Sequence, residues 1–341
     1  MDVTILQKTA EELTAPGKGI FAADATEGTM DKRMTAAGIN PTPDLRREFR
    51  EILLGTEGVG DYISGVILND EIIRQKTSDG MTFVELAGKQ KIIPGIKVDK
   101  KTHDMANFPG EKIAEGVDGL RERLTEYKAM GVRFAKFRSV ITIGEGIPTQ
   151  VCIDSNSEVQ ARYAALCQEQ DILPIVEPEV LMEGVHNIGR NEEVTKKVLT
   201  SVFKKLADHK IFFKGMLLKP NVVHPGKESG ENVDNEVVAD KTLQVLRETV
   251  PEDVPGVLFL SGGDPADEMT QHLDLMNEKG PHPWELSFSF ERALEGPTME
   301  IWQGKSENIT RAQSEFYKRA RLNSLARTGK YKVEMEKENF S

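Results

Sequence analysis

Eight short apolar segments recur along the chain. They cover residues 19–24, 62–70, 92–99, 134–141, 173–180, 213–221, 256–263 and 284–290. The polar stretches between them carry apolar residues three and four positions apart, as in DLRREFREILL and EVTKKVLTSVFKKLADH, which is the spacing of an amphipathic helix. A chain that alternates strands and helices predicts a parallel sheet, and eight repeats are the number that closes a (β/α)8 barrel.

The alternation by itself also fits an open doubly wound sheet, which could be divided into two domains. We favour the barrel because no Gly/Ser-rich or Pro-rich linker interrupts the pattern and no GxGxxG sequence follows the first predicted strand. The prediction is an α/β protein with a single (β/α)8 TIM-barrel domain over residues 1–341 and a core at about 12–304. An additional C-terminal helix over 306–328 should pack outside the barrel, followed by a short, charged, mobile tail over 329–341.

Composition narrows the class of protein. Hydrophobic residues make up 38% and charged residues 29% of the chain, as in soluble globular proteins, and no apolar run approaches the roughly 18 to 20 residues of a membrane helix. The net charge of -11 argues against nucleic acid or an anionic membrane as a partner. Cys152 and Cys167 lack the spacing of a disulfide framework or a zinc ribbon. The acidic, amphipathic N-terminal segment is unlike a secretion signal, so we expect a cytoplasmic protein.

Polar and charged side chains gather near the carboxyl ends of the predicted strands. Side chains two positions apart in a strand share a face. The sequence therefore pairs Lys97 with Asp99, Lys136 with Arg138, Glu177 with Glu179 and Lys219 with Asn221, and it places Asp24 and Ser261 at two further strand ends. In a barrel these ends form one face, where catalytic residues are found. The pattern predicts one site that several strands build together.

Some of these residues also have an ordinary structural interpretation. Asp24 could cap a following helix, and Lys97 with Asp99 could form an ion pair at a strand end. Lys136 and Arg138 could be cations on an edge strand, although the neighbouring phenylalanines favour a buried position. The segment LSGG at 260–263 could be only a tight turn.

Two features are harder to explain by structure alone. Glu177 and Glu179 lie on one face of an apolar strand, where two carboxylates repel, so at least one should meet a cation or carry a raised pKa. Lys219 follows GMLL and precedes a proline, and an unpaired ammonium removed from water costs on the order of several kcal/mol. A functional role for Lys219 is therefore favoured over a structural one.

Together these groups suggest imine chemistry on an anionic substrate. A desolvated lysine near other cations holds its proton less tightly and can form a Schiff base with a ketone or aldehyde. Neighbouring carboxylates can carry the protons that this reaction needs. Phosphate groups could be held by the backbone N–H groups of the SGG segment and by Lys97, Lys136, Arg138 and Arg292. Such a site must be a local basic pocket within an acidic protein.

Over roughly residues 12–331 the sequence resembles the class I fructose-1,6-bisphosphate aldolases. The resemblance rests on the segments GKGIFAAD, GVIL, GIKVDK, FAKFR, ARYA, PIVEPE, LLKPN, VPGVLFLSGG, SFSFERAL and NSLARTGKY, in family order. It implies a (β/α)8 barrel, commonly a homotetramer, without a cofactor or metal. The implied reaction is the reversible cleavage of fructose 1,6-bisphosphate to dihydroxyacetone phosphate and glyceraldehyde 3-phosphate in glycolysis and gluconeogenesis.

The resemblance also implies roles for the residues of these motifs. Lys219 would be the Schiff-base lysine, and Glu177 the general acid and base, with Glu179 beside the lysine as a polar neighbour. Asp24 would assist proton removal from the C4 hydroxyl, where Lys136 would hold and polarise the substrate. The C1-phosphate would be bound by Ser261, Gly262 and Arg292, and the C6-phosphate would be surrounded by Lys97, Arg138, Lys32 and Arg33.

Three departures from the animal enzymes bear on these roles. The loop after Asp24 reads ATEGT where those enzymes carry an acidic residue and serines, so Thr26 and Thr29 would offer the hydroxyls near the C6-phosphate. Glu291 replaces a glycine beside Arg292, and a carboxylate there would weaken phosphate binding. The animal chains end in a tyrosine that takes part in proton exchange, whereas this sequence reads ENFS, so we expect slower exchange.

Three alternatives to this function remain open. Another Schiff-base barrel, such as a transaldolase or deoxyribose-phosphate aldolase, would act on a different sugar phosphate, but two separate phosphate sites favour a bisphosphate. A metal-dependent aldolase would use histidine ligands, and the six histidines here are dispersed. An aldolase-like scaffold or binding protein would be free to lose Lys219 or Glu177, and both positions are filled.

Overall fold

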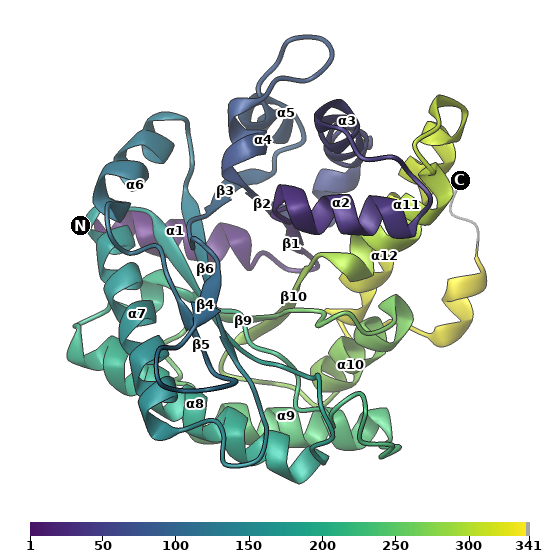
Figure 1. Ribbon diagram of the computed structural model, residues 1–341. Helices are drawn as coiled ribbons and strands as arrows, with labels where there is room; N and C mark the ends of the chain where they lie inside the picture. The colour runs from purple at the N-terminus through teal and green to yellow at the C-terminus, as the bar shows by residue number, and fades with distance from the viewer. Residues whose placement is uncertain (339–341) are drawn as a thin grey trace.

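The computed structural model describes residues 1–338 and shows eight parallel strands closed into a barrel, with helices around it (Figure 1). Around the barrel the order is β1-β10-β9-β8-β7-β6-β3-β2, and each neighbouring pair is parallel. The strands are β1 (Gly19–Ala22), β2 (Ile63–Leu68), β3 (Ile93–Lys97), β6 (Phe134–Ile141), β7 (Leu173–Val180), β8 (Leu217–Leu218), β9 (Gly256–Phe259) and β10 (Glu285–Phe290). The predicted (β/α)8 fold is confirmed.

Helices connect the strands and begin at the residues that favour helix starts. The Thr42 hydroxyl accepts a hydrogen bond from the Leu45 N–H (3.1 Å) just before Pro43, and Thr149 does the same for Cys152 (3.2 Å), as expected of N-caps. The helices are α1 (Val3–Leu13), α2 (Glu27–Ala36), α3 (Pro43–Leu54), α4 (Asp70–Arg74), α5 (Phe83–Lys89), α6 (Leu120–Ala129), α7 (Gln150–Glu169), α8 (Ile188–Asp208), α9 (Asn235–Thr249), α10 (Ala266–Glu278), α11 (Arg292–Trp302) and α12 (Ile309–Ala326). Short 3-10 turns lie at Val59–Asp61, Phe213–Gly215, Ser306–Asn308 and Val333–Lys337.

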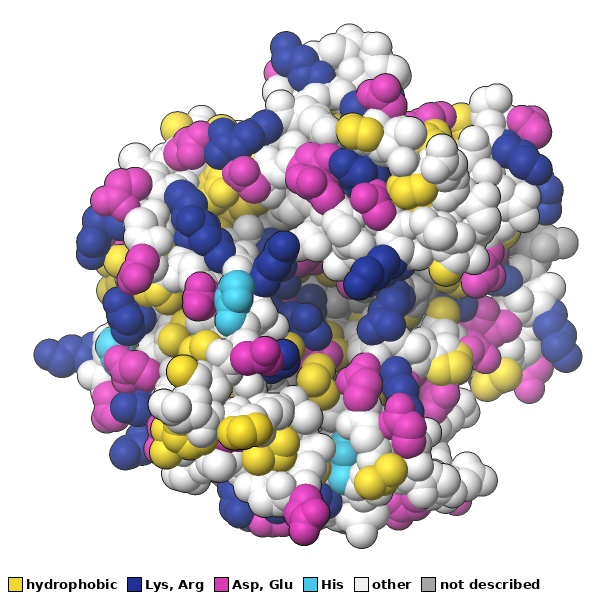
Figure 2. Space-filling view, in the orientation of Figure 1, with side chains coloured by type: hydrophobic (Ala, Val, Ile, Leu, Met, Phe, Trp, Pro, Cys, Tyr) yellow, Lys and Arg dark blue, Asp and Glu magenta, His cyan; other side chains and the backbone are white. Residues whose placement is uncertain are grey.

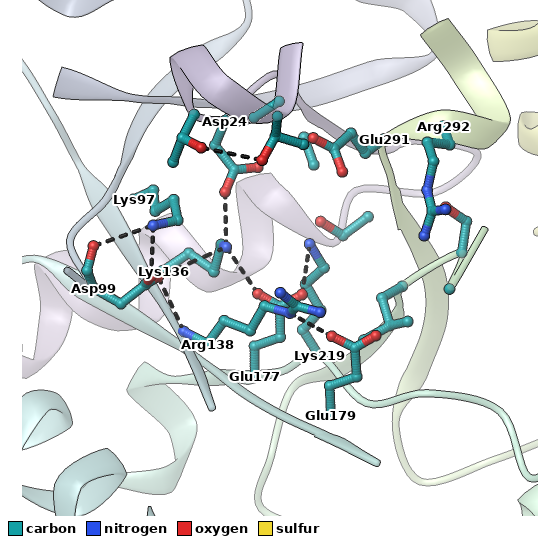
Figure 3. Close-up of a pocket in the computed structure, with 18 of the residues that line it drawn as sticks. Asp24, Lys97, Asp99, Lys136, Arg138, Glu177, Glu179, Lys219, Glu291 and Arg292 are labelled. Atoms are coloured by element: carbon teal, nitrogen blue, oxygen red, sulfur yellow. Dashed lines mark hydrogen bonds and ion pairs between the residues drawn. The ribbon is translucent and has the colours of Figure 1, made fainter. Parts of the chain in front are cut away.

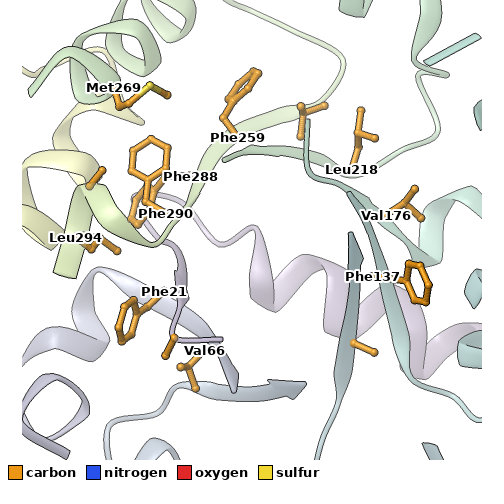
Figure 4. Close-up of a cluster of buried hydrophobic side chains, with 14 of the residues drawn as sticks. Phe21, Val66, Phe137, Val176, Leu218, Phe259, Met269, Phe288, Phe290 and Leu294 are labelled. Carbon is orange, nitrogen blue, oxygen red and sulfur yellow. The ribbon is translucent and has the colours of Figure 1, made fainter. Parts of the chain in front are cut away.

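The apolar side chains form two layers. The larger layer lies between the strands and the surrounding helices, and Figure 4 shows part of it: Phe21, Val66, Phe137, Val176, Leu218, Phe259, Met269, Phe288, Phe290 and Leu294. The second layer fills the barrel at its amino-terminal end, where Leu6 and Leu13 of α1 pack with Phe134 and Leu217. A Cβ atom on Gly95 would lie 2.3 Å from the Phe134 ring, so glycine is needed there. Apolar packing at this end leaves the carboxyl ends of the strands for charged groups.

Two parts of the structure differ from the prediction. The strand expected over 213–221 is only two residues long, because a 3-10 turn precedes it and Pro220, which has no N–H to donate, follows Lys219. A two-stranded antiparallel sheet of β4 (Thr102–Asp104) and β5 (Lys112–Ala114) was not expected. Lys219 therefore stands just past the end of a strand rather than inside one.

The C-terminal helix expected over 306–328 is present as the Ser306–Asn308 turn and α12. The described residues of the tail, which was expected to be mobile, make contacts with the body of the protein. Tyr331 is buried, and its N–H donates to Asp274 Oδ1 (2.9 Å). Glu336 pairs with the buried Arg319 at 2.6 Å. Residues 339–341, on which the expectation of slower proton exchange rests, lie outside the described part. Within residues 1–338, no helix has the length and apolar character to cross a bilayer.

Candidate active site

The carboxyl ends of the strands open into a cavity of about 480 Å³. Figure 2 shows it as a hollow near the centre of this face, bordered by lysine and arginine side chains. All fourteen predicted site residues line this one cavity: Asp24, Thr26, Thr29, Lys32, Arg33, Lys97, Lys136, Arg138, Glu177, Glu179, Lys219, Ser261, Gly262 and Arg292. The barrel thus brings together residues from both ends of the sequence.

The cavity is basic although the chain is acidic. Eight lysine or arginine residues and five aspartate or glutamate residues line it, against a net charge of -11 for the whole chain. An excess of cations in a concave site concentrates field and attracts anions. The cavity therefore suits a ligand with more than one negative group.

Lys136 is the centre of a buried ion-pair network (Figure 3). Its Nζ lies 2.7 Å from Asp24 Oδ2, 2.9 Å from Glu177 Oε2 and 4.0 Å from Asp99 Oδ2. Burial disfavours the ammonium, but the three carboxylates outweigh this effect and raise the pKa of Lys136 well above its usual value. Burial also opposes the Asp24 carboxylate, yet Lys136 and Lys219 lower the pKa of Asp24 to about 2. Both groups are therefore held in their charged forms.

One interpretation of the sequence was that Asp24 caps a helix, but the structure does not show this. Helix α2 begins at Glu27, and its N-cap is Thr26. The Asp24 side chain turns into the barrel toward Lys136 instead.

Lys219 and Glu177 face each other at the bottom of the cavity. The Lys219 N–H donates to Val176 O (2.8 Å), which extends the pairing of β8 with β7 by one residue. Lys219 Nζ lies 3.2 Å from Glu177 Oε1, and both side chains are 4% exposed. Burial would raise the pKa of Glu177, but Lys136, Lys219 and Arg138 lower it. An ionised carboxylate is thus in direct contact with the buried amine and can accept its proton.

Glu179 pairs with a cation of its own, Arg138 of the neighbouring strand. It also lines the same cavity as Lys219. Burial opposes the Arg138 charge, but Glu179 and Glu177 raise the pKa of its guanidinium. The two glutamates therefore have different cationic partners, Lys136 and Lys219 for Glu177 and Arg138 for Glu179.

Asn221 does not reach the cavity, although alternation placed it on the same face as Lys219. Its Oδ1 accepts from the Val180 N–H (2.9 Å), and its Nδ2 donates to Val222 O (2.9 Å). The chain has left the strand by this point, so the two-residue alternation no longer applies.

Several residues that build the site had no role assigned from the sequence. Gln160 of α7 donates to Phe137 O (3.1 Å) and Glu177 O (3.2 Å), which ties β6 to β7 behind the network. The Asp99 side chain is 4% exposed and accepts from the Arg138 N–H (3.2 Å), in addition to pairing with Lys97. The ion pair anticipated for Lys97 and Asp99 therefore exists, and both residues also line the cavity. Lys101, Thr102 and Ser289 also line it.

At the opposite side of the cavity, two carboxylates hold Arg33. Its Nη2 lies 2.9 Å from Glu291 Oε2 and its Nη1 lies 2.7 Å from Glu295 Oε1. Burial, together with the nearby Glu291 charge, raises the pKa of Glu295 to about 7 in spite of Arg33. Arg33, which the resemblance places around the C6-phosphate, thus lines the cavity with two carboxylate partners of its own.

Arg292 has no recorded ion-pair or hydrogen-bond partner within residues 1–338. Its guanidinium lies against Gly263, where a Cβ atom would stand 2.0 Å from Nη1. Ser261 and Gly262 line the cavity close to it. This corner combines an unpaired cation with a glycine-rich turn, an arrangement that can bind an anion.

We expect Glu291→Gln to bind inorganic phosphate more tightly than the original protein. The change removes a negative charge beside Arg292 while Glu295 still pairs with Arg33, so the dissociation constant should fall by about two- to fivefold, as for a partly exposed charge. Calorimetry at constant ionic strength measures it. Glu300→Gln, on the exposed side of the same helix α11, is the matched control. Unchanged or weaker phosphate binding in Glu291→Gln would show that Glu291 does not oppose anions here.

Among residues 1–338, no group of three or more His, Cys, Asp or Glu side chains is arranged to hold a metal ion.

Comparisons with known proteins agree in one family. The model of the glycolytic class-I fructose-bisphosphate aldolases matches residues 5–341. The sequence is 47% identical over 333 residues to a probable fructose-bisphosphate aldolase class 1 of Xanthomonas axonopodis pv. citri, covering 97% of this chain and 100% of that one. It is 45% identical over 324 residues to the cytosolic fructose-bisphosphate aldolase 4 of Arabidopsis thaliana, covering 95% and 82%. A solved structure of fructose-bisphosphate aldolase from Plasmodium falciparum, in complex with TRAP and a small molecule inhibitor, superimposes with a TM-score of 0.95 at 44% identity, covering 96% and 95%.

Proposed function

Because the chain belongs to the class-I fructose-bisphosphate aldolase family, we propose that Lys219 carries the family's reaction as a Schiff base. The protein is a carbon–carbon lyase that cleaves fructose 1,6-bisphosphate reversibly to dihydroxyacetone phosphate and glyceraldehyde 3-phosphate. The observation that supports the role of Lys219 is its 3.2 Å contact with the ionised Glu177 inside a basic cavity.

Imine formation uses these two residues. Glu177 accepts a proton from the Lys219 ammonium, and the neutral amine attacks the C2 carbonyl of the open-chain sugar. Glu177 then returns a proton to the carbinolamine hydroxyl, which leaves as water and gives an iminium ion at C2. The carboxylate is well placed for both transfers because it touches the amine directly.

Cleavage uses the network on the other side of Glu177. As the C3–C4 bond breaks, its electron pair moves toward the iminium nitrogen to form an enamine, and the C4 hydroxyl proton passes to Asp24. Lys136 stabilises the oxygen on which charge develops and keeps Asp24 ionised beforehand. After the aldehyde leaves, protonation of the enamine at C3 and hydrolysis of the iminium release dihydroxyacetone phosphate and restore Lys219.

We assign the two phosphates to the two basic ends of the cavity. Ser261, Gly262 and Arg292 would bind the C1-phosphate. The C6-phosphate would lie near Lys32, Lys97, Arg138 and the hydroxyls of Thr26 and Thr29, whose oxygens are 3.1 Å apart. Arg33 contributes less than the sequence suggested, since Glu291 and Glu295 already hold it.

We also propose a cytoplasmic location and a homotetramer. The plant relatives include cytosolic isozymes and a chloroplastic one. The tetramer is carried over from the family resemblance. Size-exclusion chromatography with light scattering tests the oligomer directly.

We expect fructose 1,6-bisphosphate cleavage to survive prolonged dialysis against a chelator, because the iminium rather than a metal ion accepts the electrons. Aldehyde release is followed in a coupled assay that needs no metal.

Fructose 1-phosphate should have a kcat/KM at least about tenfold lower than that of fructose 1,6-bisphosphate, because it lacks the charge-assisted hydrogen bonds to the missing phosphate. Activity that disappears with the chelator and returns with zinc would support a metal-dependent aldolase. A preference for the monophosphate would support a different Schiff-base aldolase, and no cleavage of either sugar would support a scaffold.

A further inference from the structure

The turn at residues 261–263 joins β9 to α10 and contains two adjacent glycines. Both have left-handed backbone angles, with φ +53° at Gly262 and +86° at Gly263. A glycine pair adopts either sign of φ at little cost, so the peptide unit between Gly262 and Gly263 can rotate to more than one orientation. Something outside the turn is needed to select one of them.

Lys227, in the loop after β8, contacts this turn from outside the cavity. Its Nζ donates to Gly262 O (2.9 Å) and forms an ion pair with Asp264 Oδ1 (3.3 Å). Its own N–H donates to Met182 O (2.8 Å). The Met182 side chain packs on Gly262, where a Cβ atom would lie 1.8 Å from Met182 Cε. Lys227 thus joins the loops that follow β7, β8 and β9.

The contact to Gly262 O fixes the direction of a backbone donor. In a planar trans peptide the C=O and the N–H point in opposite directions. Because the Gly262 C=O is directed to Lys227, the Gly263 N–H of the same unit points away from Lys227, and Gly263 itself lies against the Arg292 guanidinium. In the described part of the chain this N–H has no hydrogen-bond partner, whereas the next one, of Asp264, donates to Ser261 O (3.1 Å).

Asp264 gives the turn a second contact that depends on Lys227. Its side chain is 6% exposed, and its Oδ2 has no hydrogen-bond partner among residues 1–338. Burial raises the pKa of Asp264, and Lys227 opposes that rise. The lysine therefore neutralises the carboxylate and holds the carbonyl with one ammonium group.

We propose that Lys227 is a positioning residue, which orients the Gly262–Gly263 peptide so that its N–H can bind the C1-phosphate beside Arg292. This inference rests on the proposed function, because it needs a phosphate at this corner. Lys227 touches neither the reacting carbons nor Lys219 in this arrangement. Its loss should therefore affect phosphate affinity and leave the chemical steps intact.

The test compares dihydroxyacetone phosphate with dihydroxyacetone as ligands of Lys227→Met. The dissociation constant of the phosphorylated ligand should rise by about tenfold, the usual value of one charge-assisted hydrogen bond, while that of dihydroxyacetone stays within about twofold. For fructose 1,6-bisphosphate, KM should rise and kcat should stay nearly constant. Lys227→Arg should restore most of the affinity, because a guanidinium can reach the same two acceptors. Lys214→Met, which removes a surface lysine paired with Asp253, is the control.

The inference would be overturned if Lys227→Met bound dihydroxyacetone phosphate as tightly as the original protein does. It would also be overturned if the variant lost the same factor of affinity for dihydroxyacetone phosphate and for dihydroxyacetone. If Lys227→Met does not fold, Asp264→Asn serves instead, since it takes away one of the two groups that hold the ammonium. It should raise the dissociation constant of dihydroxyacetone phosphate by about threefold and leave that of dihydroxyacetone unchanged. If both constants stayed the same or changed equally, the inference would again be overturned. An original protein that binds dihydroxyacetone phosphate no better than dihydroxyacetone would contradict the proposed function itself, whatever the variants do.

Discussion

Lys219→Met is expected to reduce kcat/KM for fructose 1,6-bisphosphate cleavage by about 10⁵-fold or more, the loss typical of removing a covalent nucleophile. Methionine has a similar length but no amine, so no iminium can form and the C3–C4 bond has no electron sink. The fold should persist, because Glu177 keeps its ion pair with Lys136 at 2.9 Å. Single-turnover kinetics with a purified, folded variant measures the loss.

Lys214→Met is the matched control for this change. Lys214 lies five positions earlier in the chain, is half-exposed and pairs with Asp253 at the surface, so its loss should leave cleavage unchanged. If Lys219→Met kept activity within about tenfold of the original protein, which is less than one general acid–base group usually contributes, the covalent role of Lys219 would be wrong.

Lys136→Met should be the most destabilising substitution in the cavity. It leaves the buried carboxylates of Asp24, Asp99 and Glu177 without their shared cation. Removing one partner of a buried ion pair costs about 3 to 5 kcal/mol in the free energy of unfolding. Cleavage should fall as well, by roughly 10²- to 10⁴-fold, because Asp24 is no longer held ionised beside the C4 hydroxyl. Urea denaturation and steady-state kinetics measure the two effects.

Two further variants separate the charge effect from simple loss of packing. Lys128→Met removes a half-exposed lysine that pairs with Asp171 at 3.0 Å, and its stability should change by less than about 1 kcal/mol. The double variant Lys136→Met with Asp24→Asn should recover part of the lost stability and none of the activity. Stability of Lys136→Met equal to that of Lys128→Met would contradict the central position of Lys136 in the network.

The barrel could be predicted because its pattern is local. Each strand is an apolar segment bounded by polar residues, and eight repeats of the pattern leave few ways to arrange the sheet. The site followed from the same rule, since the carboxyl ends of parallel strands meet at one face. Lys136, Glu177 and Lys219 could therefore be placed together without knowing their contacts.

The details that the sequence did not yield depend on contacts between distant segments. Arg33 pairs with Glu291, 258 positions away, and with Glu295, 262 positions away, and nothing near Arg33 in the sequence indicates that it is neutralised. Glu179 of β7 pairs with Arg138 of the neighbouring strand β6, and this pairing depends on how the two strands lie side by side. Charge and length alone suggested a mobile tail, but burial of Tyr331 and the Glu336 ion pair hold it against the body.

The alternation rule failed where the strand itself ends. At β8, Pro220 stops the ladder one residue after Lys219, so Asn221 turns away from the face that simple alternation gave it. The hairpin of β4 and β5 was missed for a similar reason, because its three-residue strands are too short to show a period.

Borohydride reduction shows whether Lys219 forms the iminium. The protein is incubated with dihydroxyacetone phosphate and a chelator, reduced with borohydride, digested, and mapped by mass spectrometry. We expect one stable adduct, on the peptide that contains Lys219, and none when the substrate is omitted. No adduct, or an adduct on a different lysine of the cavity, would contradict the proposed role of Lys219.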